Sequence, residues 1–263
     1  MCARPVIALL TDFGTADHYV GVMKGVIAGI CPDALTIDIT HGVEPQDVRG
    51  AALQLEVAWR YFPTGTIFVA VVDPGVGTGR PAVAVQAGEC LFVAPDNGVL
   101  DLVLVREGAR QAHRIEQPHV QRSVVSRTFE GRDRFAPAAA WLARGLPLGE
   151  VGPPVAVGPR LVWAEPHVFP DRVVGEVVHV DRFGNLVTNL EATRWQAIVQ
   201  RAAIRVAGQG PIRVVQTYGE AAIGTLVALM GSSDRLEIAV SGGSAAARLG
   251  VGRGAEVQCV WRA

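Results

Sequence analysis

One stretch of the chain changes abruptly from apolar to turn-forming residues: Thr66-Ile67-Phe68-Val69-Ala70-Val71-Val72-Asp73-Pro74-Gly75-Val76-Gly77-Thr78-Gly79-Arg80. The apolar run 66–72 predicts a buried strand. The glycines after it allow a loop that wraps closely around a bound molecule. Open α/β sheets bind ligands at the carboxyl ends of their strands, so Asp73 is a candidate site residue, and Arg80 could fold back to hold a carboxylate or polarise a water. The alternative is a structural turn, in which Asp73 caps a helix and Arg80 is solvated.

Strand and helix patterns alternate through the N-terminal half. Apolar residues recur at spacings of three and four in 19–30, which predicts a helix, and a second helix is predicted at 47–61. Short apolar runs predict strands at 6–10, 35–39, 66–72, 81–86 and 90–94. Strands that alternate with helices of this length predict an α/β domain with a mainly parallel central sheet flanked by helices.

Three of the predicted strands end in acidic or amide side chains: Thr11-Asp12, Val72-Asp73 and Pro95-Asp96-Asn97. The carboxyl ends of parallel strands meet at one edge of a sheet, so these side chains are expected on a common rim. Asp, Asn and Gly are also the commonest turn residues. For Asp96-Asn97-Gly98 we therefore favour a structural turn.

The pattern changes in the C-terminal part of the chain. Residues 145–171 are punctuated by Pro and Gly without helical periodicity, which is typical of a linker. Beyond it, short strands are predicted at 173–180, 204–206, 212–215, 226–229, 236–240 and 256–260. Such closely spaced strands predict a small, barrel-like all-β domain. We place the domains at 1–160 and 172–263.

Composition excludes several classes of protein. The chain has 263 residues and a formal net charge of −1, with no basic run, which argues against a nucleic-acid-binding role. No apolar stretch approaches the ~20 residues that a membrane span needs. The four cysteines are far apart, and with no recognisable signal peptide they predict a reduced cytoplasmic setting. The six histidines form no HExxH pair, so no metal site is expected.

Five separated motifs resemble those of one known family. They are Thr11-Asp12-Phe13-Gly14, Asp73-Pro74-Gly75-Val76-Gly77-Thr78, Ala94-Pro95-Asp96-Asn97-Gly98, Gly131-Arg132-Asp133 with Phe135-Ala136-Pro137, and Asp181-Arg182-Phe183-Gly184-Asn185. In this order they resemble the S-adenosylmethionine hydroxide adenosyltransferases, which are related to the fluorinase and chlorinase enzymes. The resemblance covers nearly the whole chain.

The resemblance implies a fold and a reaction. It implies an N-terminal α/β domain, a smaller C-terminal β-barrel, and a homotrimer that binds substrate between one subunit's N-terminal domain and a neighbour's C-terminal domain. The implied reaction is attack of water or hydroxide on the ribose C5′ of S-adenosylmethionine, which gives adenosine and methionine without a metal or organic cofactor. The sulfonium is already a good leaving group, so the site has mainly to exclude bulk water and align one water in line.

The resemblance also implies roles for particular residues. Asp12 would bind the ribose hydroxyls, because a carboxylate can accept from both. The methionine ammonium would be held by Asp17 and Asp181, with Tyr19, Thr128, Gly131 and Ser232 nearby. Phe183 and Asn185, with backbone groups around Val240 and Gly242, would hold the adenine, and Phe129 also falls within the substrate-binding motif. Asp73 and Arg80 match two members of a water-handling triad of Asp, Arg and His.

Two positions depart from the family pattern. The triad histidine is expected between Phe129 and Gly131, where this chain has Glu130. A second carboxylate beside Asp73 adds like-charge repulsion that Arg80 would have to offset; Glu130 could act as general base, hold Arg80, mark a weakly active variant, or be incidental. Ser241 stands where relatives often carry Asn. The leading function is hydrolysis of S-adenosylmethionine. The alternatives are a catalytically silent protein that binds S-adenosylmethionine or adenosine, and a halide-dependent adenosyltransferase, against which the carboxylate of Asp73 speaks.

Overall fold

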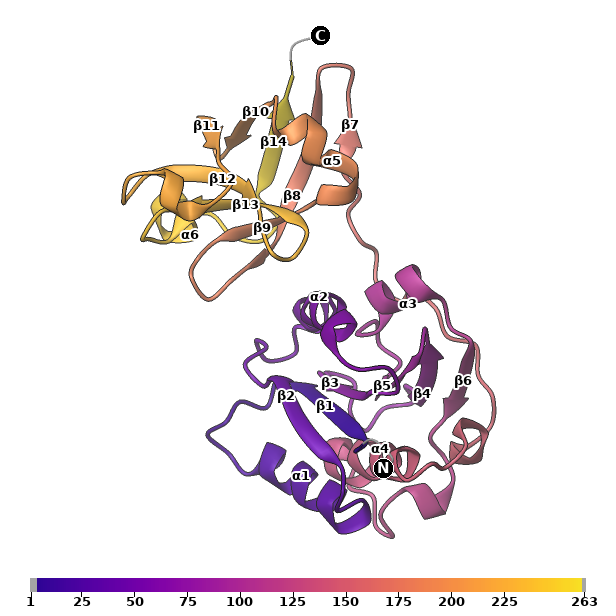
Figure 1. Cartoon of the computed structure of the whole chain (residues 1–263). Coiled ribbons are helices and arrows are strands. Elements are labelled where there is room, and N and C mark those ends of the chain that lie inside the picture. The colour runs from indigo at the N-terminus through magenta and orange to yellow at the C-terminus, as the bar shows by residue number, and fades with distance from the viewer. Residues whose placement is uncertain (1–3, 262–263) are drawn as a thin grey trace. The chain divides into compact units, whose positions relative to one another are not determined.

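A computed structural model describes residues 4–261 of the chain (Figure 1). The chain divides into two compact units, one ending at Val162 and the other beginning at Trp163. Each unit has its own hydrophobic core.

The first unit is built on a six-stranded sheet. Its strands are β1 (Val6–Thr11), β2 (Leu35–Thr40), β3 (Ile67–Val71), β4 (Ala82–Ala87), β5 (Cys90–Pro95) and β6 (Gln111–Arg114). The order is β2-β1-β3-β5-β4-β6. The first four strands in this order are parallel, and β4 runs antiparallel to both of its neighbours. The expected mainly parallel central sheet is thereby confirmed.

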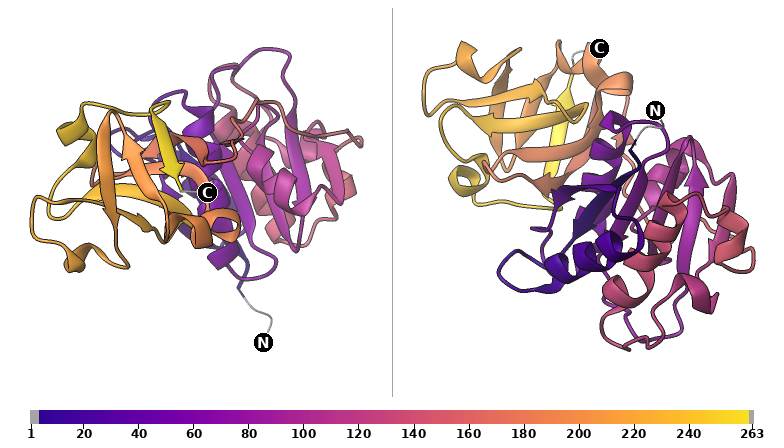
Figure 2. Two further views of the ribbon diagram at one scale, coloured as in Figure 1. Left: turned by 90° about the horizontal axis from the view of Figure 1, so that it is seen from above. Right: turned by 60° about the horizontal axis from the view of Figure 1, so that its bottom comes forward.

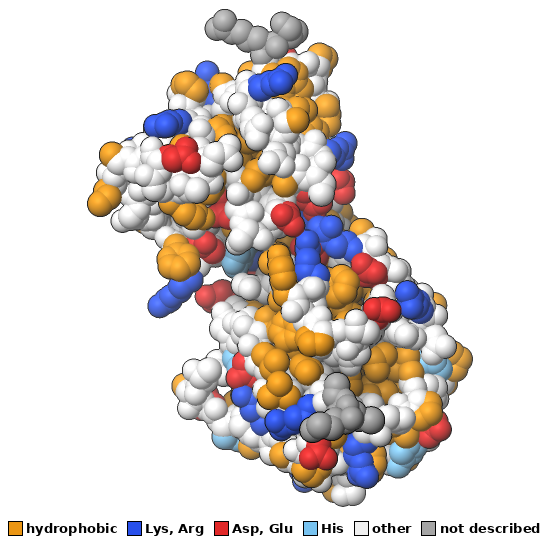
Figure 3. All heavy atoms as spheres, in the orientation of Figure 1, with side chains coloured by type: hydrophobic (Ala, Val, Ile, Leu, Met, Phe, Trp, Pro, Cys, Tyr) orange, Lys and Arg blue, Asp and Glu red, His pale blue; other side chains and the backbone are white. Residues whose placement is uncertain are grey.

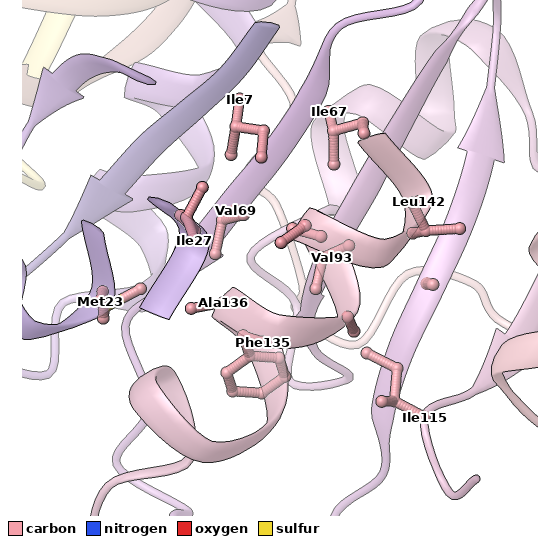
Figure 4. Close-up of a cluster of buried hydrophobic side chains, with 14 of the residues drawn as sticks. Ile7, Met23, Ile27, Ile67, Val69, Val93, Ile115, Phe135, Ala136 and Leu142 are labelled. Carbon is pink, nitrogen blue, oxygen red and sulfur yellow. The ribbon is translucent and has the colours of Figure 1, made fainter. Parts of the chain in front are cut away.

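Helices cover both faces of this sheet, as Figures 1 and 2 show. The longer ones are α1 (Tyr19–Ile30), α2 (Val48–Ala58), α3 (Asp101–Glu107) and α4 (Ala136–Ala143); short turns are η1 (Trp59–Tyr61), η2 (Pro118–Val120), η3 (Gly131–Phe135) and η4 (Leu148–Val151). On one face α1 and α4 pack their apolar side chains against the strands (Figure 4). On the other, α2 and α3 cover a second cluster that includes Leu55, Phe68 and Phe92.

Much of the segment predicted to be a linker packs on the first unit. Val155 and Val157 join the core under α2 and α3, and the Val155 N–H donates to the carbonyl of Ala112. The buried carboxylate of Asp101 accepts backbone N–H bonds from Arg160 and Leu161 at 2.7–3.0 Å. The Pro- and Gly-rich composition of 145–171 gave no sign of these contacts. The extension of the linker back to residue 145 was therefore wrong.

The second unit is a barrel. Its strands are β7 (His167–Val168), β8 (Arg172–Val180), β9 (Leu186–Glu191), β10 (Ala203–Val206), β11 (Gln209–Val214), β12 (Leu226–Met230), β13 (Arg235–Val240) and β14 (Glu256–Val260). The order is β14-β10-β11-β12-β13-β9-β8-β7, and pairing of β14 with β8 closes seven of these strands into a ring. The predicted barrel is confirmed.

The barrel also contains helical segments that the strand patterns did not predict. They are α5 (Ala192–Val199), α6 (Ala245–Leu249) and the turn η5 (Tyr218–Glu220). Trp195 and Val199 of α5 are buried in the barrel core, so this helix contributes to the same hydrophobic cluster as the strands. The barrel domain therefore carries short helices in addition to its strands.

Charged side chains of both signs are scattered over the face seen in Figure 3, among hydrophobic and uncharged ones. Within residues 4–261, no helix combines the length and the apolar character that a membrane crossing requires. The cytoplasmic location stays a prediction.

Candidate active site

A pocket of about 420 Å³ lies at the carboxyl ends of β1 and β3. Its lining residues are Asp12, Phe13, Tyr19, Pro45, Gln46, Val71, Asp73, Pro74, Val76, Thr128, Phe129, Glu130 and Gly131. Asp12 and Asp73 follow parallel neighbouring strands, which places both carboxylates at the same rim. The volume lies in the range of small-molecule sites.

The loop after β3 is a series of tight turns. The Val76 N–H donates to the carbonyl of Asp73 at 3.2 Å, and the Thr78 hydroxyl donates to that of Gly75 at 2.6 Å. Gly77 has a φ of +77°, and a Cβ there would lie 2.6 Å from the carbonyl oxygen of Arg127. Glycine is therefore required at this position on two grounds, backbone conformation and space. The turns bring Arg80 back beside Asp73.

Arg80 joins two carboxylates in a mostly buried cluster. Its Nε donates to Asp73 Oδ1 at 2.9 Å, and its Nη2 donates both to Asp73 Oδ2 and, at 2.5 Å, to Glu130 Oε2. The side chains of Arg80, Asp73 and Glu130 are only 11%, 6% and 9% exposed. Burial on its own would lower the pKa of Arg80, but the hydrogen bonds and charges of Asp73 and Glu130 outweigh it and raise that pKa. The guanidinium is therefore a fixed positive charge.

Glu130 is held from its other side as well. Arg134 lies one turn later, and its Nη1 is 3.4 Å from Glu130 Oε1. Glu130 is the residue before η3 and Arg134 lies within it; η3 is a single turn of π-helix, a feature that is common at functional sites. The guanidinium of Arg80 also lies 5.4 Å from the ring centre of Phe135 at the end of this turn. The π-turn thus supplies the carboxylate and an aromatic contact to the same arginine.

Aromatic rings form one wall of the pocket. Phe129 makes edge contacts with Phe13 and Tyr19, with ring centres 5.8 and 5.1 Å apart. Gly131 lies under this wall, where a Cβ would be 3.2 Å from Met23 Sδ and from the Phe13 and Phe129 rings. A Cβ at this position would therefore require these neighbours to shift by a few tenths of an ångström.

The carboxylate of Asp12 is fixed by a loop that the sequence did not single out. Its Oδ2 accepts the Gln46 N–H at 2.8 Å. Gln46 has a φ of +68°, a conformation that is uncommon outside glycine and concentrates at functional sites. His41 is buried and bonds Thr11 Oγ1 through Nδ1 at 2.8 Å. This bond ties His41 to Thr11 at the end of β1.

Two acidic residues of the same region lie outside the lining. Asp17 is exposed in the loop before α1. Asp96, at the end of β5, pairs with Arg160, while the Asn97 amide donates to the carbonyl of Val72 at 2.9 Å. These contacts agree with a structural turn at Asp96-Asn97-Gly98.

The second unit has a pocket of its own, of about 620 Å³. It is lined by Asp181, Phe183, Asn185, Tyr218, Ser232, Glu237, Val240, Gly242 and Gly243. This set includes all six residues of the second unit for which the family resemblance implies substrate contact. Asp181 Oδ1 accepts the N–H groups of Phe183 and Asn185 at 2.9 and 2.8 Å, and Oδ2 accepts the Asn185 side chain at 2.9 Å. Asp181 therefore shapes the β8–β9 loop. Phe183 in this loop is 76% exposed.

Three lining residues of this pocket were missed by sequence reasoning: Tyr218, Glu237 and Gly243. The Tyr218 hydroxyl donates to Glu237 Oε1 at 3.0 Å. Burial and the charge of Asp181 raise the pKa of Glu237 despite this bond, and burial together with Glu237 raises the pKa of Tyr218 to about 12. The sequence did contain a signal for Glu237, which is a lone acid inside the apolar run 236–240. Ser241 is buried, and its hydroxyl donates to the carbonyl of Ala221 at 3.2 Å.

No three His, Cys, Asp or Glu side chains within residues 4–261 lie close enough together to hold a metal ion.

In the first pocket, sequence reasoning missed Pro45 and Gln46, because neither is part of a strand-end pattern. The pairing of Glu130 with Arg134 was also missed, although the spacing of four residues was visible.

Comparison with known proteins identifies the family. Residues 7–152 match the model of the SAM hydroxide adenosyltransferase N-terminal domain, and residues 175–258 match that of the C-terminal domain. An (R)-S-adenosyl-L-methionine hydrolase of Thermus thermophilus is 41% identical, covering 97% of this chain and 99% of its own. A fluorinase of Nocardia brasiliensis is 29% identical, covering 97% and 96%.

Solved structures agree with this result. A conserved protein from Thermotoga maritima superposes with a TM-score of 0.91 at 40% identity, covering 97% of this chain and all of that one. Both domain models match in order and together cover most of the chain. The chain therefore belongs to the SAM hydroxide adenosyltransferase family.

Proposed function

We propose that this protein hydrolyses S-adenosylmethionine to adenosine and L-methionine. The observation that carries the proposal is 41% identity, over nearly the full length of both chains, to proteins named (R)-S-adenosyl-L-methionine hydrolase in Thermus thermophilus and Salinispora tropica. Those names specify the (R) form, and we propose the same form as the substrate here. The oxygen of a water attacks C5′ as the C5′–sulfur bond breaks. The bonding pair stays on sulfur, so neutral methionine leaves and one proton is released.

Asp73 is proposed to position the attacking water. Both of its oxygens accept from Arg80, and a carboxylate has about four acceptor sites, so each oxygen keeps capacity for a water. Arg80 fixes the orientation of Asp73, and Glu130 holds Arg80 from the far side. Glu130 is thus proposed to hold the arginine, one of the roles left open by the sequence. The carboxylate of Asp73 would repel fluoride or chloride at the same position, which disfavours the halide-dependent alternative.

The substrate contacts are proposed from the two pockets. Asp12 would accept from the ribose hydroxyls beside the aromatic wall of Tyr19 and Phe129, with Thr128 and Gly131 nearby. For the methionine ammonium we propose Asp17 and Asp181, with Ser232 nearby. Asp17 lies outside both pocket linings, in the exposed loop before α1. The exposed Phe183, together with Asn185 and the backbone of Val240 and Gly242, would hold adenine.

The direct test is incubation of the purified protein with each sulfonium form of S-adenosylmethionine, followed by chromatographic separation of the products. We expect equimolar adenosine and methionine, formed from the (R) form. Adenosine formation at the rate of the buffer alone would refute the hydrolase. If S-adenosylmethionine still bound, that result would favour the silent binding protein.

We also propose a homotrimer whose substrate lies between the first unit of one subunit and the second unit of a neighbour. The proposal follows from family membership, and the presence of one candidate pocket on each unit supports it. Light scattering at micromolar concentration should then give three times the chain mass of 27.8 kDa. A monomer with unaltered ligand binding would contradict the shared site.

A further inference from the structure

Among residues 4–261, the contact that links Arg134 to the candidate active site is the one with Glu130. Its Nη1 is 3.4 Å from Glu130 Oε1, while Glu130 Oε2 accepts from Arg80. Its Nε donates to Gln121 Oε1 at 3.0 Å, which fixes the direction of the side chain. Arg134 does not line the pocket. The side-chain contacts thus link Arg134 to Arg80 through Glu130.

A charge count shows what Arg134 adds. Asp73 and Glu130 carry two negative charges against one positive charge on Arg80, so this mostly buried trio is one charge short of balance. Charges that are removed from water have to be paired, or they distort their surroundings. Arg134 supplies the missing positive charge, and arginine keeps it at all ordinary pH values. With it, the four side chains are neutral as a group.

The shared donor makes this balance matter for geometry. Arg80 Nη2 has two N–H groups and bonds Asp73 and Glu130 at once, so a shift of the guanidinium toward one carboxylate lengthens its bond to the other. A Glu130 that lost Arg134 would have only Arg80 as an ionic partner and would attract it more strongly. Asp73 would then lose part of the contact that orients it. A small misplacement of a positioned group can lower a rate substantially.

We propose that Arg134 is a positioning residue that balances the charge of Glu130 and so keeps Arg80 on Asp73. The role rests on the proposed hydrolase activity. It assigns Glu130 and Arg134 to one functional pair, four residues apart on the π-turn. Since the Arg134 side chain is 31% exposed, its replacement leaves no sealed cavity in the core.

The test compares Arg134→Met with Arg134→Lys in steady-state hydrolysis. Partners one contact removed from the reacting centre change function by about 10–100-fold where they support metal ligands, and we expect a loss of about tenfold in kcat for Arg134→Met at the low end of that range. KM should change by less than about twofold, because Arg134 is not itself a lining residue of the pocket. Arg134→Lys restores the charge and should recover most of the rate. A merely structural role of Arg134 would not lower kcat while sparing KM, and lysine would not restore the rate.

Two further variants complete the design. Arg144→Met removes an exposed arginine at the end of the neighbouring helix α4, where it stacks 5.1 Å from Trp141, and should leave kcat unchanged. In a Glu130→Gln background there is no carboxylate to balance, so adding Arg134→Met should cost no further rate. This non-additivity is the signature of two residues that act through one another.

Each outcome decides one question. A wild-type rate in Arg134→Met, with hydrolysis intact in the parent, would overturn the role of Arg134 alone. The role would also be overturned if Arg134→Met lowered kcat as much in the Glu130→Gln background as in the wild-type protein, because the effect would then not depend on Glu130. A parent protein without hydrolysis would refute the proposed function and this role together.

Discussion

Replacing Asp73 by alanine is expected to lower kcat by about 10²–10⁴-fold, the range typical of positioned acid–base groups. Substrate binding should change much less, because Asp73 acts on the attacking water and not on the leaving methionine. Arg80→Ala should have a similar effect, since both oxygens of Asp73 depend on that guanidinium. The measurement is kcat at saturating S-adenosylmethionine, with binding followed separately by calorimetry.

Asp96→Ala is a matched control for this variant. Asp96 also follows a parallel strand of the same sheet, its side chain is 7% exposed, and it pairs with an arginine, Arg160. It does not line the pocket. We expect Asp96→Ala to leave kcat near the wild-type value. Wild-type turnover in Asp73→Ala would show that the water is held elsewhere.

The strand ends could be predicted from the sequence for a simple physical reason. A parallel strand buried on both faces has to be an apolar run, and the run 66–72 ends where the chain meets solvent at Asp73. The same reasoning places Asp12 and Asp73 on one rim, and both line one pocket. The resemblance to a family added the residues of the second unit, which periodicity alone would not have found.

Other features had no periodic signal. Helix α4 is buried on nearly every side and rich in alanine, so it has no polar face to reveal its period. The left-handed backbone of Gln46 and the π-turn both depend on tertiary contacts. Local backbone preferences disfavour the first and do not specify the second. The bond between Arg80 and Glu130 joins residues 50 positions apart. Such pairings follow from the fold and cannot be predicted from local sequence patterns.

A second buried acid, Asp133, anchors the π-turn that presents Glu130. Replacing Asp133 is expected to lower the stability of the folded protein substantially. Asp133 is fully buried, and its carboxylate accepts the Ser126 N–H at 2.9 Å and two Arg132 bonds at 2.7 Å. Arg122 Nε lies a further 3.3 Å away. Hydrogen bonds to charged groups contribute about 1.5–3 kcal/mol each, and the exposed arginines can rehydrate. We therefore expect Asp133→Asn to lower the free energy of unfolding by about 2–4 kcal/mol.

This contribution should depend on pH in a defined direction. Burial alone would raise the pKa of Asp133, but the bonds from Arg132 and Ser126 outweigh it and hold the pKa below its usual value. A carboxyl whose pKa is lower in the folded state stabilises that state above the unfolded pKa of about 4. The contribution is lost as the pH falls through the folded-state pKa. The difference between wild type and Asp133→Asn should thus be full at pH 7 and shrink below about pH 4.

Urea unfolding at pH 7 and at acidic pH, followed for both variants, measures this difference. Asp171→Asn is the matched control, because Asp171 also pairs with an adjacent arginine, Arg172, but its side chain is 52% exposed. Exposed pairs contribute about 0–1 kcal/mol, so this variant should unfold almost as wild type does. Equal, small losses for the two variants would mean that burial adds nothing to the Asp133 pair. The anchoring of the π-turn would then have to come from its apolar contacts, with Phe135 as the main buried side chain.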